Sequence, residues 1–236
     1  MRIAILEDDP VQAGILNDTL SSAGHNCHLF PTGDLLVQRM RRETFDLLIL
    51  DWIVPGMSGE EVLKWVRQDV SKWLPILFLT SRGRETDIAS VLDSGADDYI
   101  VKPVGTTVLL ARVEALLRRA YSLDPSAIKE VFGEIEFDLK AQKVLVKGKA
   151  MSVTQKEFEL ALLLFRGLGK PLSRAHIIET IWKQTADIPS RTMDTHVSGV
   201  RTKLGLRPEN GYRLSCIYGY GYRLDTIGQA ADQPTE

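Results

Sequence analysis

Three carboxylates and one lysine lie where they could act together on a phosphoryl group. Glu7 and Asp8 follow one short apolar run, Asp51 follows a second, and Lys102 follows a third. Proteins bind Mg2+ through one or two carboxylates together with water and phosphate oxygens. Phosphoryl transfer to a carboxylate depends on positioning and charge neutralisation, which a metal ion and Lys102 would supply. These residue types predict Mg2+-dependent phosphoryl chemistry, with the Thr80 hydroxyl as a further donor to the phosphoryl oxygens.

The elements that must position these residues are the strands of a parallel sheet. Five short apolar runs alternate with helical patterns, of which three lie near 59–70, 84–94 and 106–119. This alternation predicts a parallel sheet covered by helices on both faces. Ligands of such sheets bind beyond the carboxyl ends of the strands. We therefore expect four strand ends to bring the acids, Thr80 and Lys102 into one pocket.

A single aspartate after an apolar run is more often a turn or cap residue than a functional group. Asp9, which precedes Pro10, is itself predicted to be the N-cap of the first helix. The combination is more specific, because acids, a hydroxyl and the pair Lys102-Pro103 all end strands of one predicted sheet. The combination favours the functional interpretation.

About residues 1–120 resemble a receiver domain. The resemblance rests on the acids, Thr80 and Lys102-Pro103, and on the segments PGMSG at 55–59 and SGADDY at 94–99. It implies an α/β, flavodoxin-like (βα)5 fold with strand order 2-1-3-4-5.

The same resemblance implies roles for the acidic residues. Asp51 would be the phosphorylated residue, and Asp8 would bind Mg2+ directly. Glu7 would act mainly through water, and the backbone carbonyl of Ile53 would complete the metal site.

A switch is also implied. On phosphorylation Thr80 would move toward the phosphoryl oxygens, and Tyr99 would then turn inward to fill the vacated space. Taken alone, Tyr99 is more often a sheet aromatic, but its place three residues before Lys102-Pro103 matches the family. The Lys102–Pro103 bond would be cis, which is uncommon even for proline.

The second half of the chain has a different pattern. Residues 120–130 read as a linker, and two short alternating runs, 134–139 and 143–146, predict a small antiparallel sheet. Thr154 and Glu157 form a predicted capping box at the start of a helix. A second helix follows Ser173, a third spans about 191–204, and a glycine-rich hairpin ends the pattern. This order describes either a winged helix-turn-helix or another small α+β domain.

Motifs over about 128–225 favour the winged helix, because they resemble the OmpR/PhoB effector domain. They are LSR at 172–174, SRTMDTHV at 190–197, VRTKLG at 200–205 and GYGYRL at 219–224. The resemblance implies that the helix from Arg191 lies in the major groove of DNA, with the hairpin as a wing. The loop 183–190 would contact RNA polymerase. The predicted DNA-binding residues are Arg191, Thr192, Thr195, His196, Ser198, Arg201, Thr202, Lys203, Tyr218 and Tyr220.

Four positions depart from the family pattern. Ser198 and Gly199 stand where many relatives have arginines in the recognition helix, and Tyr218 stands where many have a wing arginine. We place Gly199 on the outward side of the helix, where it offers no contact to a base. Val108 replaces a glutamate that many relatives use in an ion pair between receivers. The predicted dimer interface nevertheless keeps Asp97, Asp98, Arg112 and Arg119.

The predicted organisation is a receiver at 1–120, a linker at 121–127, a C-terminal α+β winged helix-turn-helix domain at 128–226 and a tail at 227–236. The chain has a formal net charge of −2, with the negative excess in the first half. Its two cysteines form no metal-binding spacing, and no apolar run approaches the length of a membrane span. We expect a cytoplasmic protein.

The favoured function is a transcriptional response regulator that a sensor histidine kinase phosphorylates, and that dimerises and binds double-stranded promoter DNA. One alternative is a phosphatase with an aspartate nucleophile, but such enzymes carry a second aspartate where this chain has Ile53. The other alternative is a regulator that works without phosphorylation, which the intact set of pocket residues disfavours. No catalytic residue is predicted.

Overall fold

A computed structural model describes residues 1–81, 83–121, 127–183 and 190–227, and the chain divides into two compact units, Met1–Asp124 and Pro125–Glu236. The division falls inside the expected linker, of which residues 122–126 lie outside the described part of the chain. The exact domain and tail boundaries stay predictions. Within the described residues, no helix is both long and apolar enough to cross a membrane.

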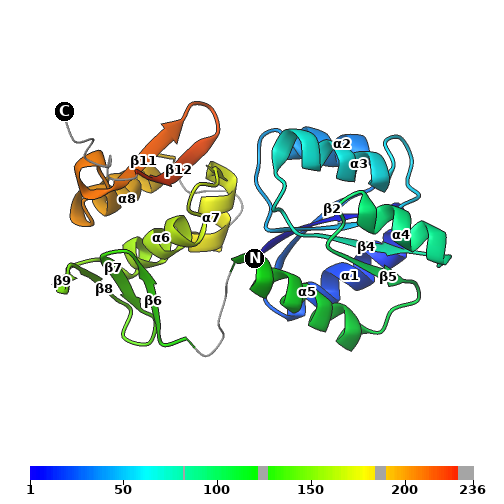
Figure 1. Ribbon diagram of the computed structural model, residues 1–236, viewed down its shortest axis with the longest axis horizontal. Helices are drawn as coiled ribbons and strands as arrows, with labels where there is room; N and C mark the ends of the chain where they lie inside the picture. The colour runs from blue at the N-terminus through cyan, green and yellow to red at the C-terminus, as the bar shows by residue number, and fades with distance from the viewer. Residues whose placement is uncertain (82, 122–126, 184–189, 228–236) are drawn as a thin grey trace, which may run out of the picture. The chain divides into compact units, whose positions relative to one another are not determined.

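The first unit contains five parallel strands in the order β2-β1-β3-β4-β5, which confirms the predicted receiver fold (Figure 1). The three inner strands, β1, β3 and β4, are short runs of buried residues because helices cover both faces of the sheet, whereas the edge strands β2 and β5 are only partly buried. The strands are β1 (Arg2–Leu6), β2 (Asn26–Phe30), β3 (Leu47–Leu50), β4 (Ile76–Thr80) and β5 (Asp98–Val101).

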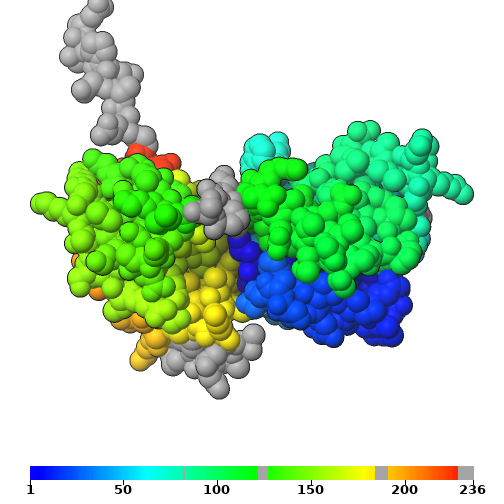
Figure 2. All heavy atoms as spheres, turned by 90° about the horizontal axis from the view of Figure 1, so that it is seen from below, coloured from blue at the N-terminus to red at the C-terminus, as the bar shows by residue number. Residues whose placement is uncertain are grey.

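Five helices cover this sheet. Alternation along β1 sends Ile3 and Ile5 into the core under α1 and α5, while Ala4 and Leu6 enter the core on the other face. Figure 2 looks onto the side where α1, in blue, and α5, in green, lie next to each other. The helices are α1 (Pro10–Ser22), α2 (Gly33–Met40), α3 (Gly59–Trp65), α4 (Glu85–Asp93) and α5 (Thr106–Tyr121).

Two helix ends differ in how well they were predicted. Asp9 accepts hydrogen bonds from the backbone nitrogens of Val11 and Gln12, so the predicted N-cap of α1 is confirmed. The helix expected over 59–70 is α-helical only to Trp65 and continues as a π-helical turn, η1 (Val66–Val70). Arg67 in that turn donates to the carbonyl of Gly95 at 2.8 Å.

The second unit joins three helices to two small sheets around one core, as expected of a winged helix-turn-helix. Its first sheet is β6 (Lys129–Phe132), β7 (Ile135–Asp138), β8 (Lys143–Val146) and β9 (Lys149–Met151). The helices are α6 (Gln155–Arg166), α7 (Arg174–Trp182) and α8 (Ser190–Lys203). The wing pairs β11 (Tyr212–Ile217) with β12 (Gly221–Thr226), after a 3-10 turn, η2 (Pro208–Asn210).

The prediction missed three strands of this unit. β6 begins inside the residues read as linker, β9 follows the predicted turn, and β10 (Leu172–Ser173) pairs with β12 beside the wing. β9 and β10 are only three and two residues long. Runs so short carry too few residues to display the two-residue alternation of a strand, so only their pairing identifies them.

Candidate functional site

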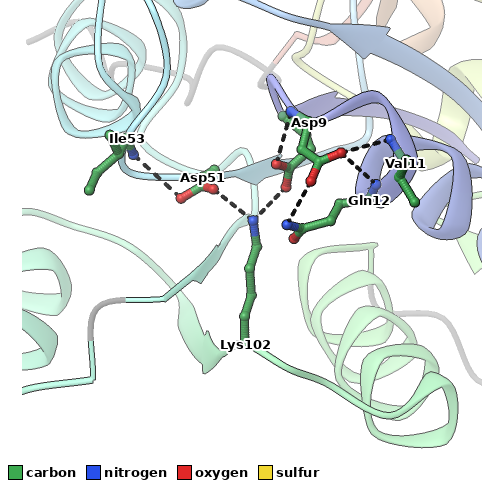
Figure 3. A network of polar contacts seen from close by, with 7 residues as sticks. Asp9, Val11, Gln12, Asp51, Ile53 and Lys102 are labelled. Carbon is green, nitrogen blue, oxygen red and sulfur yellow. Dashed lines mark hydrogen bonds and ion pairs between the residues drawn. The ribbon is translucent and has the colours of Figure 1, made fainter.

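Three strand ends bring Glu7, Asp51 and Lys102 together at one edge of the receiver sheet. Glu7 follows β1, Asp51 follows β3, and Lys102 follows β5. The Lys102 ammonium nitrogen lies 2.6 Å from Glu7 Oε2. It also lies 2.7 Å from Asp51 Oδ2, toward which it points in Figure 3. Glu7 and Asp51 are 4% and 8% exposed. Lys102 therefore offsets part of the negative charge of two carboxylates that the fold has removed from water.

The two neighbouring aspartates have different environments. Asp8 is exposed, and with Glu7 and Asp51 it forms a group whose ligand oxygens lie within 4.8 Å of one another. Asp9 is occupied as the cap of α1, and the backbone N–H of Val11 and the side chain of Gln12 lower the pKa of its carboxyl. Hard oxygen donors in such a cluster fit Mg2+. The candidate metal site is therefore Glu7, Asp8 and Asp51.

Burial and hydrogen bonding set the protonation of this cluster. Burial raises the pKa of Glu7, and the hydrogen bond from Lys102 offsets only part of that rise. Burial lowers the pKa of Lys102, but hydrogen bonds to Asp51 and Glu7 more than reverse it, so its pKa is raised. Lys102 thus stays cationic, and one ammonium faces several carboxylates. The remaining negative charge favours a divalent cation.

Ile53, Thr80 and Tyr99 are the other residues that were predicted to act at this site. The backbone nitrogen of Ile53 donates to Asp51 Oδ1 at 3.4 Å, so this oxygen is held less tightly than Oδ2. Thr80 is fully buried at the end of β4, and Tyr99 is already buried, with 8% exposed, in this structure. The Lys102–Pro103 peptide bond is cis, as the resemblance implied.

A hollow of about 470 Å3 opens beside the cluster. The acids and Lys102 line it, together with apolar residues of α1 and α5 such as Ile15, Leu16 and Leu109. Its size leaves room for a hydrated metal ion and a phosphoryl group beside Asp51.

Three of the four charged residues of the expected dimer face, Asp97, Asp98 and Arg112, are paired within the chain. Arg112 Nη1 donates to both oxygens of Asp98, at 2.8 and 2.7 Å. Asp97 accepts from Arg67 at 2.8 Å and from the backbone nitrogen of Ile76. Arg119 is exposed on α5, and Val108 is 49% exposed. Ion pairs with a second copy would compete with these internal pairs.

Helix α8 has four distinct faces. As predicted, the core face is formed by Met193, Val197, Val200 and Leu204, and all four are at most 2% exposed. Leu204 directly follows the last residue of α8. The opposite face repeats the same spacing of four, three and four residues and is exposed: Arg191, Thr195, Ser198 and Thr202. Of the predicted DNA contacts on α8, these four are exposed and the others are partly buried.

The remaining predicted contacts on α8 lie on two partly buried flanks. Arg201 donates to the carbonyl of Leu214 in the wing at 3.0 Å. On the other flank, His196 Nδ1 lies 2.8 Å from the carbonyl of Thr192, and its ring packs edge-on against Trp182. This second flank is Thr192, His196, Gly199 and Lys203.

The placement of Gly199 on the outward side was wrong. A Cβ at Gly199 would lie 2.6 Å from Glu157 Oε1, so this position faces α6. Lys203, expected beside the outward side, reaches the same residue, with Nζ 2.7 Å from Glu157 Oε2. Tyr218 at the tip of the wing is fully exposed, and Tyr220 is partly buried.

Sequence reasoning missed the residues that hold α8 to the rest of its domain. Asp194 accepts hydrogen bonds from Arg174 at the start of α7 and from Tyr222 of β12. Burial raises the pKa of Asp194, but these two donors outweigh it, so its pKa is lowered. Glu157 was recognised as a capping residue, yet nothing in the sequence signalled its contact with Lys203.

Both halves of the chain match known families. Residues 3–114 match the response regulator receiver domain, and residues 148–224 match the family described as transcriptional regulatory protein, C terminal. The chain is 33% identical over 228 residues to the phosphate regulon transcriptional regulatory protein PhoB of Rhizobium meliloti, which covers 95% of this chain and 99% of that protein.

Two further relatives extend this likeness over nearly the whole chain. One is the DNA-binding response regulator MtrA of Mycolicibacterium smegmatis, 33% identical over 222 residues, with 94% of this chain and 96% of that protein covered. The other is the transcriptional regulatory protein AfsQ1 of Streptomyces coelicolor, 34% identical over 223 residues, with 94% and 97% covered.

Proposed function

The chain belongs to the OmpR/PhoB family of two-component response regulators and is a DNA-binding transcription factor rather than an enzyme, and on that premise we propose that phosphorylation of Asp51 controls it. The observation that carries this proposal is the ammonium of Lys102 between Glu7 and Asp51, beside the carboxylate of Asp8. A sensor histidine kinase would supply the phosphoryl group, in the cytoplasm.

The residues present suit phosphoryl transfer to Asp51. Its less tightly held oxygen, Oδ1, would attack phosphorus while the bond from phosphorus to the donor breaks. Glu7, Asp8, Asp51 and the carbonyl of Ile53 would hold Mg2+, which when bound neutralises charge between the two anions. Lys102 would then pair with the phosphoryl oxygens.

Labelling with a small phosphodonor tests the assignment. We expect hydroxylamine-labile phosphate on the wild-type chain with Mg2+, and none on D51N or in EDTA. D8N and D9N are a matched pair, because Asp8 belongs to the acidic cluster and Asp9 caps α1. D8N should lose Mg2+-dependent labelling, and D9N should keep it. Label retained by D51N would refute the assignment.

The two alternative functions fit less well. A phosphatase with an aspartate nucleophile needs a second acid two residues later, and this chain has Ile53, which is 57% exposed. The intact set of pocket residues, which is Glu7, Asp8, Asp51, Thr80 and Lys102, argues against a regulator that works without phosphorylation.

Thr80 and Tyr99 are the proposed switch. Thr80 ends β4 beside the pocket, and Tyr99 lies on the neighbouring strand, where β4 and β5 pair Phe78 with Tyr99. A phosphoryl group on Asp51 would give the Thr80 hydroxyl a new acceptor. Because Tyr99 is already buried, the change would be a shift in how the ring packs within the core.

Phosphorylation would promote a homodimer through α4, β5 and α5. Asp97, Asp98, Arg112 and Arg119 lie on these elements or between them. Exposed ion pairs contribute only about 0–1 kcal/mol each, so the missing partner at Val108 weakens such a dimer modestly.

Helix α8 is the proposed recognition helix, with Thr195, Ser198 and Thr202 as base contacts and Arg191 at a phosphate. Arginine reads guanine through two hydrogen bonds, whereas each of these hydroxyls offers a single short contact. Sequence recognition would therefore depend on DNA shape and on the spacing of two half-sites about one helical turn apart. Tyr218 and Tyr220 of the wing would contact the backbone of the minor groove.

Binding titrations across single-base and spacer variants, at one salt concentration, test this mode of recognition. We expect a shallow loss for each base change within a half-site and a sharp loss for altered spacing. A single base pair whose change costs about 3 kcal/mol would contradict it, because that is the upper range for direct readout. The proposed contact between RNA polymerase and loop 183–190 involves residues 184–189, which lie outside the described part of the chain.

A further inference from the structure

Glu157 links the start of α6 to the C-terminal part of α8. Its Oε2 accepts from the backbone nitrogen of Thr154 at 2.7 Å, which closes the capping box of α6, and from Lys203 Nζ at 2.7 Å. The Glu157 side chain is 9% exposed and that of Lys203 is 38% exposed. One carboxylate oxygen therefore serves both a helix cap and an ion pair between helices.

Gly199 makes room for this carboxylate. Lys203 and Gly199 are four residues apart, so they lie on the same flank of α8. A methyl group at Gly199 would come within 2.6 Å of Glu157 Oε1. Since Oε2 is held from two sides, the carboxylate cannot turn away without loosening its bonds to Thr154 and Lys203.

The charges on α8 are consequently unequal in their availability to DNA. Arg191 is exposed on the outward face, whereas Lys203 lies on the flank with its ammonium on Glu157. Burial raises the pKa of Glu157, but the hydrogen bonds from Lys203 and Thr154 have a larger effect in the opposite direction. The pKa of Glu157 is therefore lowered. Glu157 is thus an anion at neutral pH, beside a helix that approaches a polyanion.

We propose that Glu157 is a positioning residue of the DNA-binding surface, which holds Lys203 against α6 and so withdraws it from the phosphates, and that Gly199 is the space this arrangement requires. Lys203 then contributes to the placement of α8 and not to the salt dependence of binding. This inference rests on the proposed role of α8 as recognition helix. It removes Lys203 from the predicted DNA-binding residues.

The salt dependence of binding measures the number of phosphate contacts directly. The slope of log affinity against log salt changes by about 0.9 for each phosphate contact with duplex DNA. The experiment uses the full chain and a random-sequence duplex, because non-specific binding depends on these contacts. The variants are K203M, E157Q, the double variant and R191M, each checked for folding by circular dichroism.

We expect K203M to keep the steepness of the wild-type slope and R191M to make the slope shallower by about 0.9. E157Q should increase the slope by about 0.9, because it frees Lys203, and the double variant should return to the wild-type value. A slope reduced in K203M, or unchanged in E157Q, would overturn the inference. If E157Q does not fold, the slope measured for K203M tests the inference by itself.

The control separates this inference from the proposal on which it rests. If R191M also keeps the wild-type slope, α8 does not face the DNA backbone, and the assignment of the recognition helix is wrong. If R191M and K203M both reduce the slope, α8 is the recognition helix and only the restraint by Glu157 is wrong.

Discussion

Two lysines in this chain form ion pairs of the same length in different surroundings. Lys102 lies 2.6 and 2.7 Å from Glu7 and Asp51, and these three side chains are 13%, 3% and 10% exposed. Lys203 lies 2.7 Å from Glu157, but its own side chain is 38% exposed. The first lysine neutralises charge that the fold has buried, whereas the second fixes the position of a helix. The nitrogen–oxygen distance therefore does not distinguish the two roles, whereas the burial of the lysine side chain does.

Removal of each lysine should separate these roles most strongly. K102M leaves two buried carboxylates without a counter-charge, so we expect the metal-free chain to lose about 3–5 kcal/mol of unfolding free energy. K203M removes a partly exposed pair and should lose less than about 1 kcal/mol. Urea titrations of the full chain in EDTA measure both. Added Mg2+ should restore part of the stability of K102M, and equal losses in the two variants would contradict the comparison.

The pair between Arg112 and Asp98 extends the comparison to the proposed dimer face. Its side chains are 45% and 27% exposed, so it resembles the pair of Lys203 more than that of Lys102. R112E places a second carboxylate beside Asp98, and we expect it to weaken the phosphoprotein dimer about tenfold, or about 1.4 kcal/mol. Sedimentation of the phosphorylated chain measures this, with V108T as a conservative control. An unchanged equilibrium in R112E would place the interface elsewhere.

A third test concerns the space beside Glu157. Replacing a glycine inside a helix by alanine ordinarily stabilises a protein by about 1 kcal/mol. In G199A the new methyl group would meet Glu157 Oε1, so we expect no gain or a small loss of unfolding free energy. S198A, on the exposed face one residue earlier, should change stability little. A full gain of about 1 kcal/mol in G199A would show that the carboxylate moves away freely.

The smallest expected effect is the pH dependence of the Glu157 contribution. The folded pKa of Glu157 lies below the ordinary value of a glutamate carboxyl, so the ionised form stabilises the domain above that ordinary value, and the contribution is lost as the pH falls through the folded pKa. The stability difference between wild type and E157Q should be constant near neutral pH and shrink below about 4.5. Calorimetry across this range measures it. The shrinkage should be weaker in a K203M background, and a difference independent of pH would argue against the ion pair.

The receiver pocket was predictable from the sequence because its geometry follows from the topology. A parallel sheet places all carboxyl strand ends at one edge, so residues that directly follow apolar runs must converge there. Glu7, Asp51 and Lys102 do converge, although Lys102 is 95 residues from Glu7. The helix caps at Asp9 and Thr154 were also predictable, because a capping side chain forms hydrogen bonds only with residues two or three positions along the chain.

The DNA-binding helix was predictable only in part. Its apolar repeat identifies the core face, because hydrophobic residues at spacings of three and four lie on one side of a helix and pack into the core. The same repeat does not distinguish among the three polar faces, since a threonine, glycine or lysine suits both water and a packed flank. What separates Arg191 from Lys203 is a carboxylate on another helix, 46 residues away from the lysine. The sequence by itself determined which side of α8 is buried, and only the packing of α6, α7 and the wing decided which polar side remains free.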